Sequence, residues 1–271
     1  MTNSMTSFID TLCGRLNKID SSEFDVGNKQ TKQKIISDIC SVLVDFTSSA
    51  HEAKHNIDWS YPNPEWYDHR CDQFFQFSKR RNSHWVERGV YSSIILKPSS
   101  NILELCSGDG FNTYHFYSNR CNSIDAIDFD KSAYDHAVDQ YNLPNINFIL
   151  GDIRTDLPDK QYDAIIWDTA IEHFTEEEIT TIMKRLKNSM NEGAVLTGHT
   201  IKENGTGGKM LPQHEREFTS KEDLAQFFEP YFKNVCVFET IHPDRHNYYF
   251  YASDFALPFS TEWEGTFKVS R

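Results

Sequence analysis

The chain has 271 residues and a formal net charge of −13 at pH 7. This acidity argues against a broad nucleic-acid surface, because neutralising phosphates requires clustered Lys and Arg side chains. No apolar run approaches the ~20 residues that span a bilayer, and the first residues lack the basic start and apolar core of a secretion signal. The six cysteines contain no CxxC pair, so we expect reduced thiols and a cytoplasmic protein without a zinc knuckle or a disulfide framework.

Residues 1–97 carry helical patterning and predict an N-terminal helical cap. The apolar positions of this pattern are Ile35, Ile36, Ile39, Leu43 and Phe46. The second half is crowded with aromatic residues, namely Trp59, Trp66, Tyr67, Phe74, Phe75, Phe77, Trp85 and Tyr91. These aromatic rings form either a small packing core or a lid that binds an acceptor molecule. We therefore predict a cap and acceptor-binding region over 1–97, a core over 98–255 and a C-terminal tail over 256–271.

The stretch 101–111 predicts a buried strand followed by a tight turn at Gly108 and Gly110. The glycines allow the close backbone approach that a bound ligand requires, and a helix beginning near Asn112 aims its N-terminal amides at that ligand. A second apolar run ends in Asp128, 18 residues after Gly110. A carboxylate at this place can accept hydrogen bonds from two ribose hydroxyls, so the pattern predicts an adenosine-cofactor site.

The residue at position 113 indicates which type of adenosine cofactor fits this pattern. The GxGxxG pattern that holds a pyrophosphate has Gly or Ala three residues after its second glycine, whereas this chain has Thr113. The stretch resembles instead the first motif of class I S-adenosylmethionine-dependent methyltransferases, an acidic residue followed by a glycine-rich turn. The matching residues are Glu104, Cys106, Gly108 and Gly110, with Cys106 where the family usually has its first glycine.

Three further segments resemble motifs of the same family and follow in its order. Residues 147–152 resemble the third strand, residues 162–168 the fourth and residues 193–199 the fifth. The resemblance covers roughly residues 98–255. In addition, residues 84–90 look like a segment that precedes the first motif in some bacterial small-molecule and surface-sugar methyltransferases.

The family resemblance implies a doubly wound α/β fold with seven strands in the order 3-2-1-4-5-7-6, the last strand antiparallel. Strand and helix signals alternate along the chain as this fold requires. Capping boxes at Thr175-x-x-Glu178 and Thr219-x-x-Glu222 predict two helix starts. Residues 235–241 and 248–251 then predict a terminal hairpin.

The resemblance also implies which residues hold the cofactor. Glu104 would meet the methionyl ammonium, Asp128 the ribose and Asp152 the adenine, while the backbone of 168–170 would meet the methionine portion. Asp130 is expected to face away. The complete set of expected contacts is Glu104, Cys106, Gly108, Gly110, Asp128, Phe129, Asp152, Ile153, Asp168 and Thr169.

Methyl transfer from a sulfonium depends mainly on positioning, and a hydroxyl acceptor gains from a general base. His173 is the first candidate base, because it follows the fourth strand at its C-terminal end, and Glu172 beside it can orient the ring or the substrate. The two residues are equally well explained as a helix start that satisfies local backbone groups. His199 and His214 are the alternative bases.

Glu172, His173 and His214 also resemble the metal cluster of certain RNA 2′-O-methyltransferases and ubiquinone-pathway O-methyltransferases, whose motif reads Glu-x-x-Glu-His. Because Thr169 stands where that motif has its first Glu, we expect no metal, and a divalent ion at these residues is the alternative. Nearby, Gly205, Gly207 and Gly208 indicate a mobile loop over the site or a plain turn.

Together these features predict an S-adenosylmethionine-dependent methyltransferase that acts on a small molecule, at a sugar or metabolite hydroxyl. An RNA or protein methyltransferase is the competing enzyme, and the acidic charge counts against it. A non-enzymatic cofactor-binding scaffold is the third alternative. No pattern in the chain separates an oxygen acceptor from a nitrogen acceptor.

Overall fold

The computed structural model describes residues 14, 29–55, 83–203, 212–242, 245–257 and 266–268. The chain divides into two compact units, one made of Met1–Asn63 and Arg70–Arg81 and the other of Pro64–His69 and Asn82–Arg271. The aromatic residues between Trp59 and Phe77, the side chain of Trp85 and the glycines at 205–208 lie outside the described residues. The acceptor-binding role of residues 1–97 therefore stays a prediction.

Helix α2 (Lys29–His55) belongs to the first unit and contains no Gly or Pro over its 27 residues. Ile35 and Val42, seven residues apart and thus on one helix face, are buried, whereas Ile36 and Leu43 are exposed. The predicted helical pattern is confirmed here. Among the described helices, none combines the length and the hydropathy that a transmembrane segment requires.

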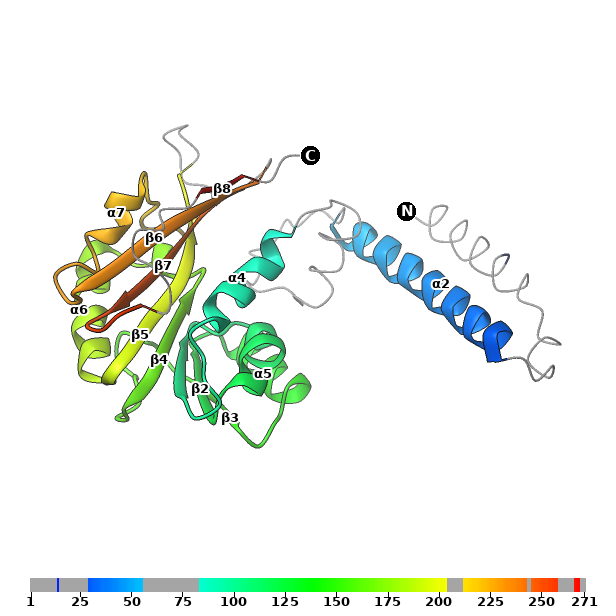
Figure 1. The fold of residues 1–271 in the computed structure, drawn as a ribbon, viewed down its shortest axis with the longest axis horizontal. Coiled ribbons are helices and arrows are strands. Elements are labelled where there is room, and N and C mark those ends of the chain that lie inside the picture. The colour runs from blue at the N-terminus through cyan, green and yellow to red at the C-terminus, as the bar shows by residue number, and fades with distance from the viewer. Residues whose placement is uncertain are drawn as a thin grey trace. The chain divides into compact units, whose positions relative to one another are not determined.

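The second unit contains a sheet with the strand order β3-β2-β1-β4-β5-β7-β6-β8 (Figure 1). The strands are β1 (Asn101–Leu105), β2 (Ser123–Asp128), β3 (Ile146–Leu150), β4 (Tyr162–Asp168), β5 (Met190–Ile201), β6 (Asn234–Ile241), β7 (His246–Ser253) and β8 (Thr266–Lys268). Strands β1 to β5 pair in parallel, and β7 pairs antiparallel with β5 and β6. The predicted seven-strand order is confirmed. The expected tail adds an eighth strand, β8, which runs parallel to β6.

Side chains of the central strands alternate between two apolar layers, one on each face of the sheet. Leu103 of β1 and Trp167 of β4 pack with helix α6 (Glu176–Asn188) and helix α7 (Lys221–Ala225). Ile102 and Ile166 face the other way, toward the layer that contains Tyr117. Both faces of the sheet are covered, and most residues of the central strands are accordingly apolar, as is usual in parallel sheets.

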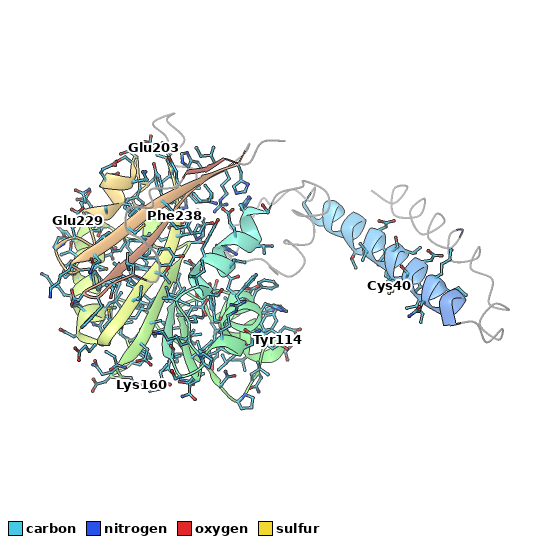
Figure 2. All side chains as sticks on the ribbon, in the orientation of Figure 1. Cys40, Tyr114, Lys160, Glu203, Glu229 and Phe238 are labelled. Carbon is cyan, nitrogen blue, oxygen red and sulfur yellow. The ribbon has the colours of Figure 1, made fainter. Side chains whose placement is uncertain are left out.

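The aromatic residues of the terminal hairpin extend the second layer. Phe238 of β6, labelled in Figure 2, stacks on Tyr249 and Tyr251 of β7 with ring centroids 5.1 and 6.1 Å apart. Tyr91, on helix α4 (His84–Ser93), packs edge-on against Phe238 at 5.1 Å. Helix α4, which lies within the predicted cap, is thus part of the sheet's own packing.

Helix α6 begins where the capping box predicts. The Thr175 hydroxyl accepts from the Glu178 amide at 3.3 Å, and the Glu178 carboxylate accepts from the Thr175 amide at 2.9 Å. The residues expected on its apolar face, Ile179, Ile182, Met183 and Leu186, are all fully buried.

Two predicted helix starts differ from the structure. Near Asn112 the chain forms a π-helical turn, η2 (Thr113–Tyr117), followed by the 3-10 turn η3 (Ser118–Arg120), and not a regular α-helix. The cap of α7 is Ser220 and not Thr219, because the Ser220 hydroxyl accepts from the Asp223 amide at 3.1 Å. The Asp223 carboxylate accepts from the amide of Thr219, the residue before the cap, at 2.8 Å, so this helix start is not the predicted capping box.

Candidate functional site

The turn that follows β1 has the backbone shape of a ligand-binding turn. Cys106, Gly108 and Gly110 all have positive φ angles, of 56°, 55° and 76°. At Gly110 an added Cβ atom would lie 2.9 Å from Ala137 and from the Phe148 ring, so only glycine fits. At Gly108 an added Cβ atom would meet nothing within 4 Å. The turn is therefore packed on one side and open on the other.

Asp128, at the end of β2, ties that turn to the neighbouring strand. Its Oδ2 accepts from the Gly108 amide at 2.7 Å and its Oδ1 from the Asp130 amide at 2.8 Å. A carboxylate can accept several hydrogen bonds, so ribose hydroxyls are suitable donors to this group. Phe129 beside it is 68% exposed, and Ile153 is buried. The carboxylate of Asp130 is turned to the N-terminus of helix α5 (Lys131–Gln140), where it caps the Ser132 and Ala133 amides.

Glu104, in β1, is a buried carboxyl group close to other acids. It is 3% exposed, and its Oε2 accepts from the Thr113 hydroxyl at 2.6 Å. Burial raises the pKa of Glu104 to about 8, and the carboxylates of Asp168, Asp128 and Asp109 act in the same direction. A cationic ligand group would offset both effects, so this position fits an ammonium group.

Asp152, at the end of β3, already has a cation beside it. Its carboxylate accepts from Arg154 Nη2 at 2.6 Å and from Arg154 Nε at 2.9 Å. Arg154 also reaches Glu178 at 3.0 Å. The Arg154 guanidinium lowers the pKa of Asp152, so an adenine amino group would share an ionised carboxylate with Arg154.

The end of β4 is held by helix α4 and by the π-helical turn. Asp168 accepts from the Tyr117 hydroxyl at 2.6 Å and from the Ser92 hydroxyl at 2.9 and 3.0 Å. Thr169 has a positive φ of 52°, and its hydroxyl accepts from Arg88 Nη1 at 3.0 Å. The Asp168 side chain is therefore committed to local structure. Part of the backbone is committed as well, because the Thr169 amide donates to the His199 carbonyl at 2.8 Å and the Ala170 carbonyl accepts from the His173 amide at 3.0 Å. The expected contact of 168–170 with the methionine portion stays a prediction.

His199, one of the alternative bases, lies on β5 and pairs with Asp168, the last residue of β4. It is 1% exposed, its ring stacks on Tyr249 with centroids 5.2 Å apart, and its Nδ1 lies 3.1 Å from the Thr169 hydroxyl. Burial lowers the pKa of His199. The structure places it in the core packing, apart from the other two candidate histidines.

Glu172, His173 and His214 come together although 40 residues of sequence separate the last two. One ligand-type atom from each residue lies within 4.8 Å of the others. Glu172 and His173 form the 3-10 turn η4 (Ile171–His173) directly after β4. The loop of His214 is bound to this turn, because the amides of Glu215 and Arg216 both donate to the Glu172 carbonyl, at 2.8 and 3.0 Å.

Glu217 is a further member of this cluster that the sequence did not reveal. Its Oε1 lies 2.5 Å from Nδ1 of His214, and both side chains are buried. The sequence around Glu217 contains no motif that marks it, so only the burial of its side chain beside His214 distinguishes it.

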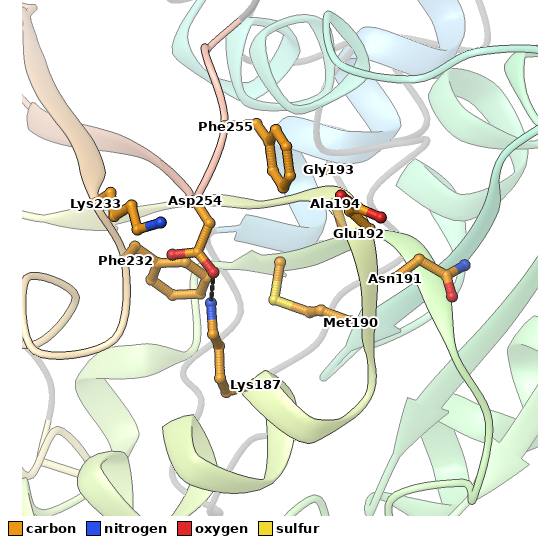
Figure 3. A pocket seen from close by; sticks show the side chains of 10 residues that line it. All are labelled: Lys187, Met190, Asn191, Glu192, Gly193, Ala194, Phe232, Lys233, Asp254 and Phe255. Atoms are coloured by element: carbon orange, nitrogen blue, oxygen red, sulfur yellow. Dashed lines mark hydrogen bonds and ion pairs between the residues drawn. The ribbon is translucent and has the colours of Figure 1, made fainter.

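A shallow pocket lies at the other end of the sheet (Figure 3). It is lined in part by Met190, Phe232 and Phe255, beside the ion pair of Lys187 and Asp254. Met190 begins β5, so this pocket lies at the N-terminal end of that strand. Open α/β sheets bind ligands at the carboxyl ends of their strands, which is where the glycine-rich turn and η4 lie.

Known proteins are similar to part of this sequence and to its fold. Residues 102–193 match a family model described as a methyltransferase domain, and no curated protein matches the chain. The fold is similar to that of the DhpI-SAH complex, at 14% identity and a TM-score of 0.51, over 79% of this chain and 98% of that one. It is also similar to the N-methyltransferase NodS from Bradyrhizobium japonicum, at 13% identity and a TM-score of 0.51, over 65% and 97%. At such identities these structures support the fold alone.

Proposed function

We propose that this protein is an S-adenosylmethionine-dependent methyltransferase and that it methylates a small molecule at a hydroxyl group of a sugar or another metabolite; the match to a methyltransferase-domain model supports the first part. The observation that carries the proposal is the cluster of Glu172, His173 and His214 directly after β4. It lies at the same edge of the sheet as the glycine-rich turn, where a methyl acceptor would face the cofactor.

Five of the expected cofactor residues have a specific chemical role in this proposal. The open side of Gly108 admits the cofactor, and Asp128 accepts from its ribose hydroxyls. Glu104 meets the methionyl ammonium, and Phe129 and Asp152 flank the adenine. S-adenosylmethionine supplies a methyl group that is already activated on a sulfonium, so these residues need only hold it in place.

For the acceptor, the reaction requires that its oxygen be aligned with the methyl group and that its hydroxyl proton be removed. The acceptor oxygen attacks the methyl carbon opposite the sulfur, the carbon–sulfur bond breaks, and the sulfur keeps the electron pair. The hydroxyl proton must leave, and the cluster offers two imidazoles and a buried carboxylate for this purpose. Our sequence prediction that His173 or His214 acts as the base without a metal is one way to use these groups.

The net charge of the chain favours a small molecule over RNA as the methyl acceptor. The net charge of −13 disfavours RNA, whose binding depends on clustered basic residues. Because NodS is an N-methyltransferase by name, amines belong in the test beside hydroxyl compounds.

The test is transfer of a labelled methyl group from S-adenosylmethionine to a panel of monosaccharides, nucleotide sugars, phenols and primary amines, with total RNA and denatured protein as further acceptors. We expect a labelled small molecule with a hydroxyl group. Labelled RNA or protein alone would support the competing enzyme. Cofactor binding without any transfer would support the scaffold alternative.

A further inference from the structure

We infer that Glu172, His173 and His214 form a three-ligand site for a divalent transition-metal ion, with Glu217 holding His214 in the ligating orientation. The site itself stands on the geometry of these residues, whereas its part in methyl transfer rests on the proposed function. Three observations support it.

The first observation is the carboxylate of Glu172, which is completely buried. Its Oε2 accepts from the Thr200 hydroxyl at 2.9 Å, but its Oε1 has no hydrogen-bond partner among the described residues. A buried oxygen of a charged group without a donor costs more than the ~1 to 3 kcal/mol of a neutral one. Such an atom calls for an explanation, and a bound cation provides one.

The second observation is the orientation of the two imidazole rings. Nδ1 of His214 faces Glu217 Oε1 at 2.5 Å, and Nδ1 of His173 faces the Gln213 carbonyl at 3.4 Å. An acceptor at Nδ1 keeps the ring proton on that nitrogen, so the lone pair lies on Nε2 of each ring. Histidines that bind metal ions have this arrangement, in which a carboxylate or a carbonyl holds the distal N–H.

The third observation is that the loop of His214 is fixed before any ion binds. Besides the two amides that donate to Glu172, Arg216 pairs with Glu176 and with Asp223 on either side of the loop. Its guanidinium also lies over the Phe227 ring at 5.2 Å. Preformed ligands need little reorganisation to bind an ion.

The donor set indicates which ion fits. Two imidazole nitrogens and one carboxylate oxygen suit Zn²⁺ or Co²⁺ better than Mg²⁺, which prefers oxygen ligands and retains its waters. The Thr169 hydroxyl is bound to Arg88 and His199 and does not belong to the set. Three protein ligands leave coordination positions for the acceptor hydroxyl, whose proton would be lost more easily there.

Calorimetric titration of the tag-free, chelator-treated protein with ZnCl₂, CoCl₂, MnCl₂ and MgCl₂ tests the site without cofactor or acceptor. We expect one saturable site, tightest for Zn²⁺ and weakest for Mg²⁺. His214→Ala and His173→Gln should each weaken binding at least about 100-fold. Glu217→Gln should weaken it about 10- to 100-fold, the usual effect of losing an orienting carboxylate.

Glu215→Gln is the matched control, because Glu215 is an exposed neighbour in the same loop. It should bind the metal like the unmodified protein, and circular dichroism should show every variant folded. His173 is the less buried of the two histidines, so His173→Gln tests the site even if His214→Ala fails to fold.

Absence of a saturable metal site in the folded protein would overturn this inference. The two histidines would remain candidate bases, and the proposed function would be unaffected. A metal site in a protein that transfers no methyl group to small molecules would leave the inference standing and remove the proposed function. Equal binding by the Glu217→Gln and unmodified proteins would remove the role of Glu217.

Discussion

Glu104 is the residue whose environment most clearly departs from that of an ordinary surface acid. Burial raises its pKa to about 8, so the ligand-free protein holds this carboxyl group largely protonated at neutral pH. The sequence could indicate Glu104 as a cofactor residue from its place before the glycine-rich turn. It could not indicate the protonation state, which arises first from the burial of Glu104 and then from the carboxylates of Asp168, Asp128 and Asp109, which three different segments bring near.

The first prediction concerns the pH dependence of cofactor binding. A methionyl ammonium beside Glu104 favours the ionised carboxylate, so binding releases a proton below pH 8. Affinity for S-adenosylhomocysteine should rise between pH 6 and pH 8, by at most about 10-fold per pH unit. Calorimetry in two buffers with different ionisation enthalpies measures the released proton. Glu104→Gln should bind more weakly and without this slope, and an unchanged slope would place the proton elsewhere.

The second prediction concerns stability without ligand. The folded-state pKa of Glu104 lies above its unfolded value of about 4.3, so its contribution to stability falls as pH rises from about 4.3 to 8. Glu104→Gln should therefore raise the Tm at pH 8, by roughly 2–4 °C for each kcal/mol recovered. Thermal melts at pH 5 and pH 8 provide the comparison, with the difference shrinking at pH 5. An equal effect at both pH values would mean that ionisation plays no part.

The third prediction concerns turnover. His173→Ala or His214→Ala should cut kcat by about 10²- to 10⁴-fold, the usual contribution of a group that manages the acceptor proton. Affinity for S-adenosylmethionine should stay near that of the unmodified protein, because neither residue is among the expected cofactor contacts. Full activity in both variants would mean that positioning alone carries the reaction.

Among the helices and strands, those with a repeating apolar pattern could be predicted from the sequence. Those marked only by single contacts could not. Buried strands β1 and β4 and the capped helix α6 follow from apolar periodicity and from Thr175 with Glu178. The π-helical turn η2 does not follow from periodicity. Within it the hydroxyls of Thr113 and Tyr117 donate to the buried carboxylates of Glu104 and Asp168, contacts that no repeat in the sequence indicates. Strand β8 is three residues long, too short for any periodicity to show.

The fourth prediction belongs to this scale. Ser220 caps helix α7, so Ser220→Ala should lower the free energy of unfolding by about 1 kcal/mol. Thr219→Ala removes only the hydroxyl that donates to Asp223 at 3.1 Å, and should cost less. Urea denaturation of both variants measures the difference. A larger loss at Thr219 would restore the cap predicted from sequence.

For the whole molecule, the order of motifs along the chain predicted the sheet, since the four segments 101–111, 147–152, 162–168 and 193–199 follow the order of the family that they resemble. The candidate site was predictable only in part. Glu172 and His173 adjoin a strand end, and His214 could be suspected, but their meeting depends on the loop that donates to the Glu172 carbonyl. Glu217 has no sequence signal at all, because its role follows from burial beside His214.

The fifth prediction concerns the cofactor site itself, at the junction of β1 and β2. Asp128→Ala should weaken binding of S-adenosylmethionine by about 1 to 3 kcal/mol, the cost of leaving hydroxyl groups without their acceptor. Asp135→Ala is the matched control, since Asp135 is an exposed acid in the helix that follows and pairs with Lys131. It should leave the affinity unchanged.

Calorimetric titration of the three proteins with S-adenosylmethionine and with NAD tests the central claim most directly. We expect saturable binding of S-adenosylmethionine, weakened by Asp128→Ala alone, and no comparable binding of NAD, because Thr113 replaces the third glycine of a pyrophosphate-binding turn. Equal affinity for NAD, or an Asp128→Ala variant that binds S-adenosylmethionine as tightly as the unmodified protein, would contradict it.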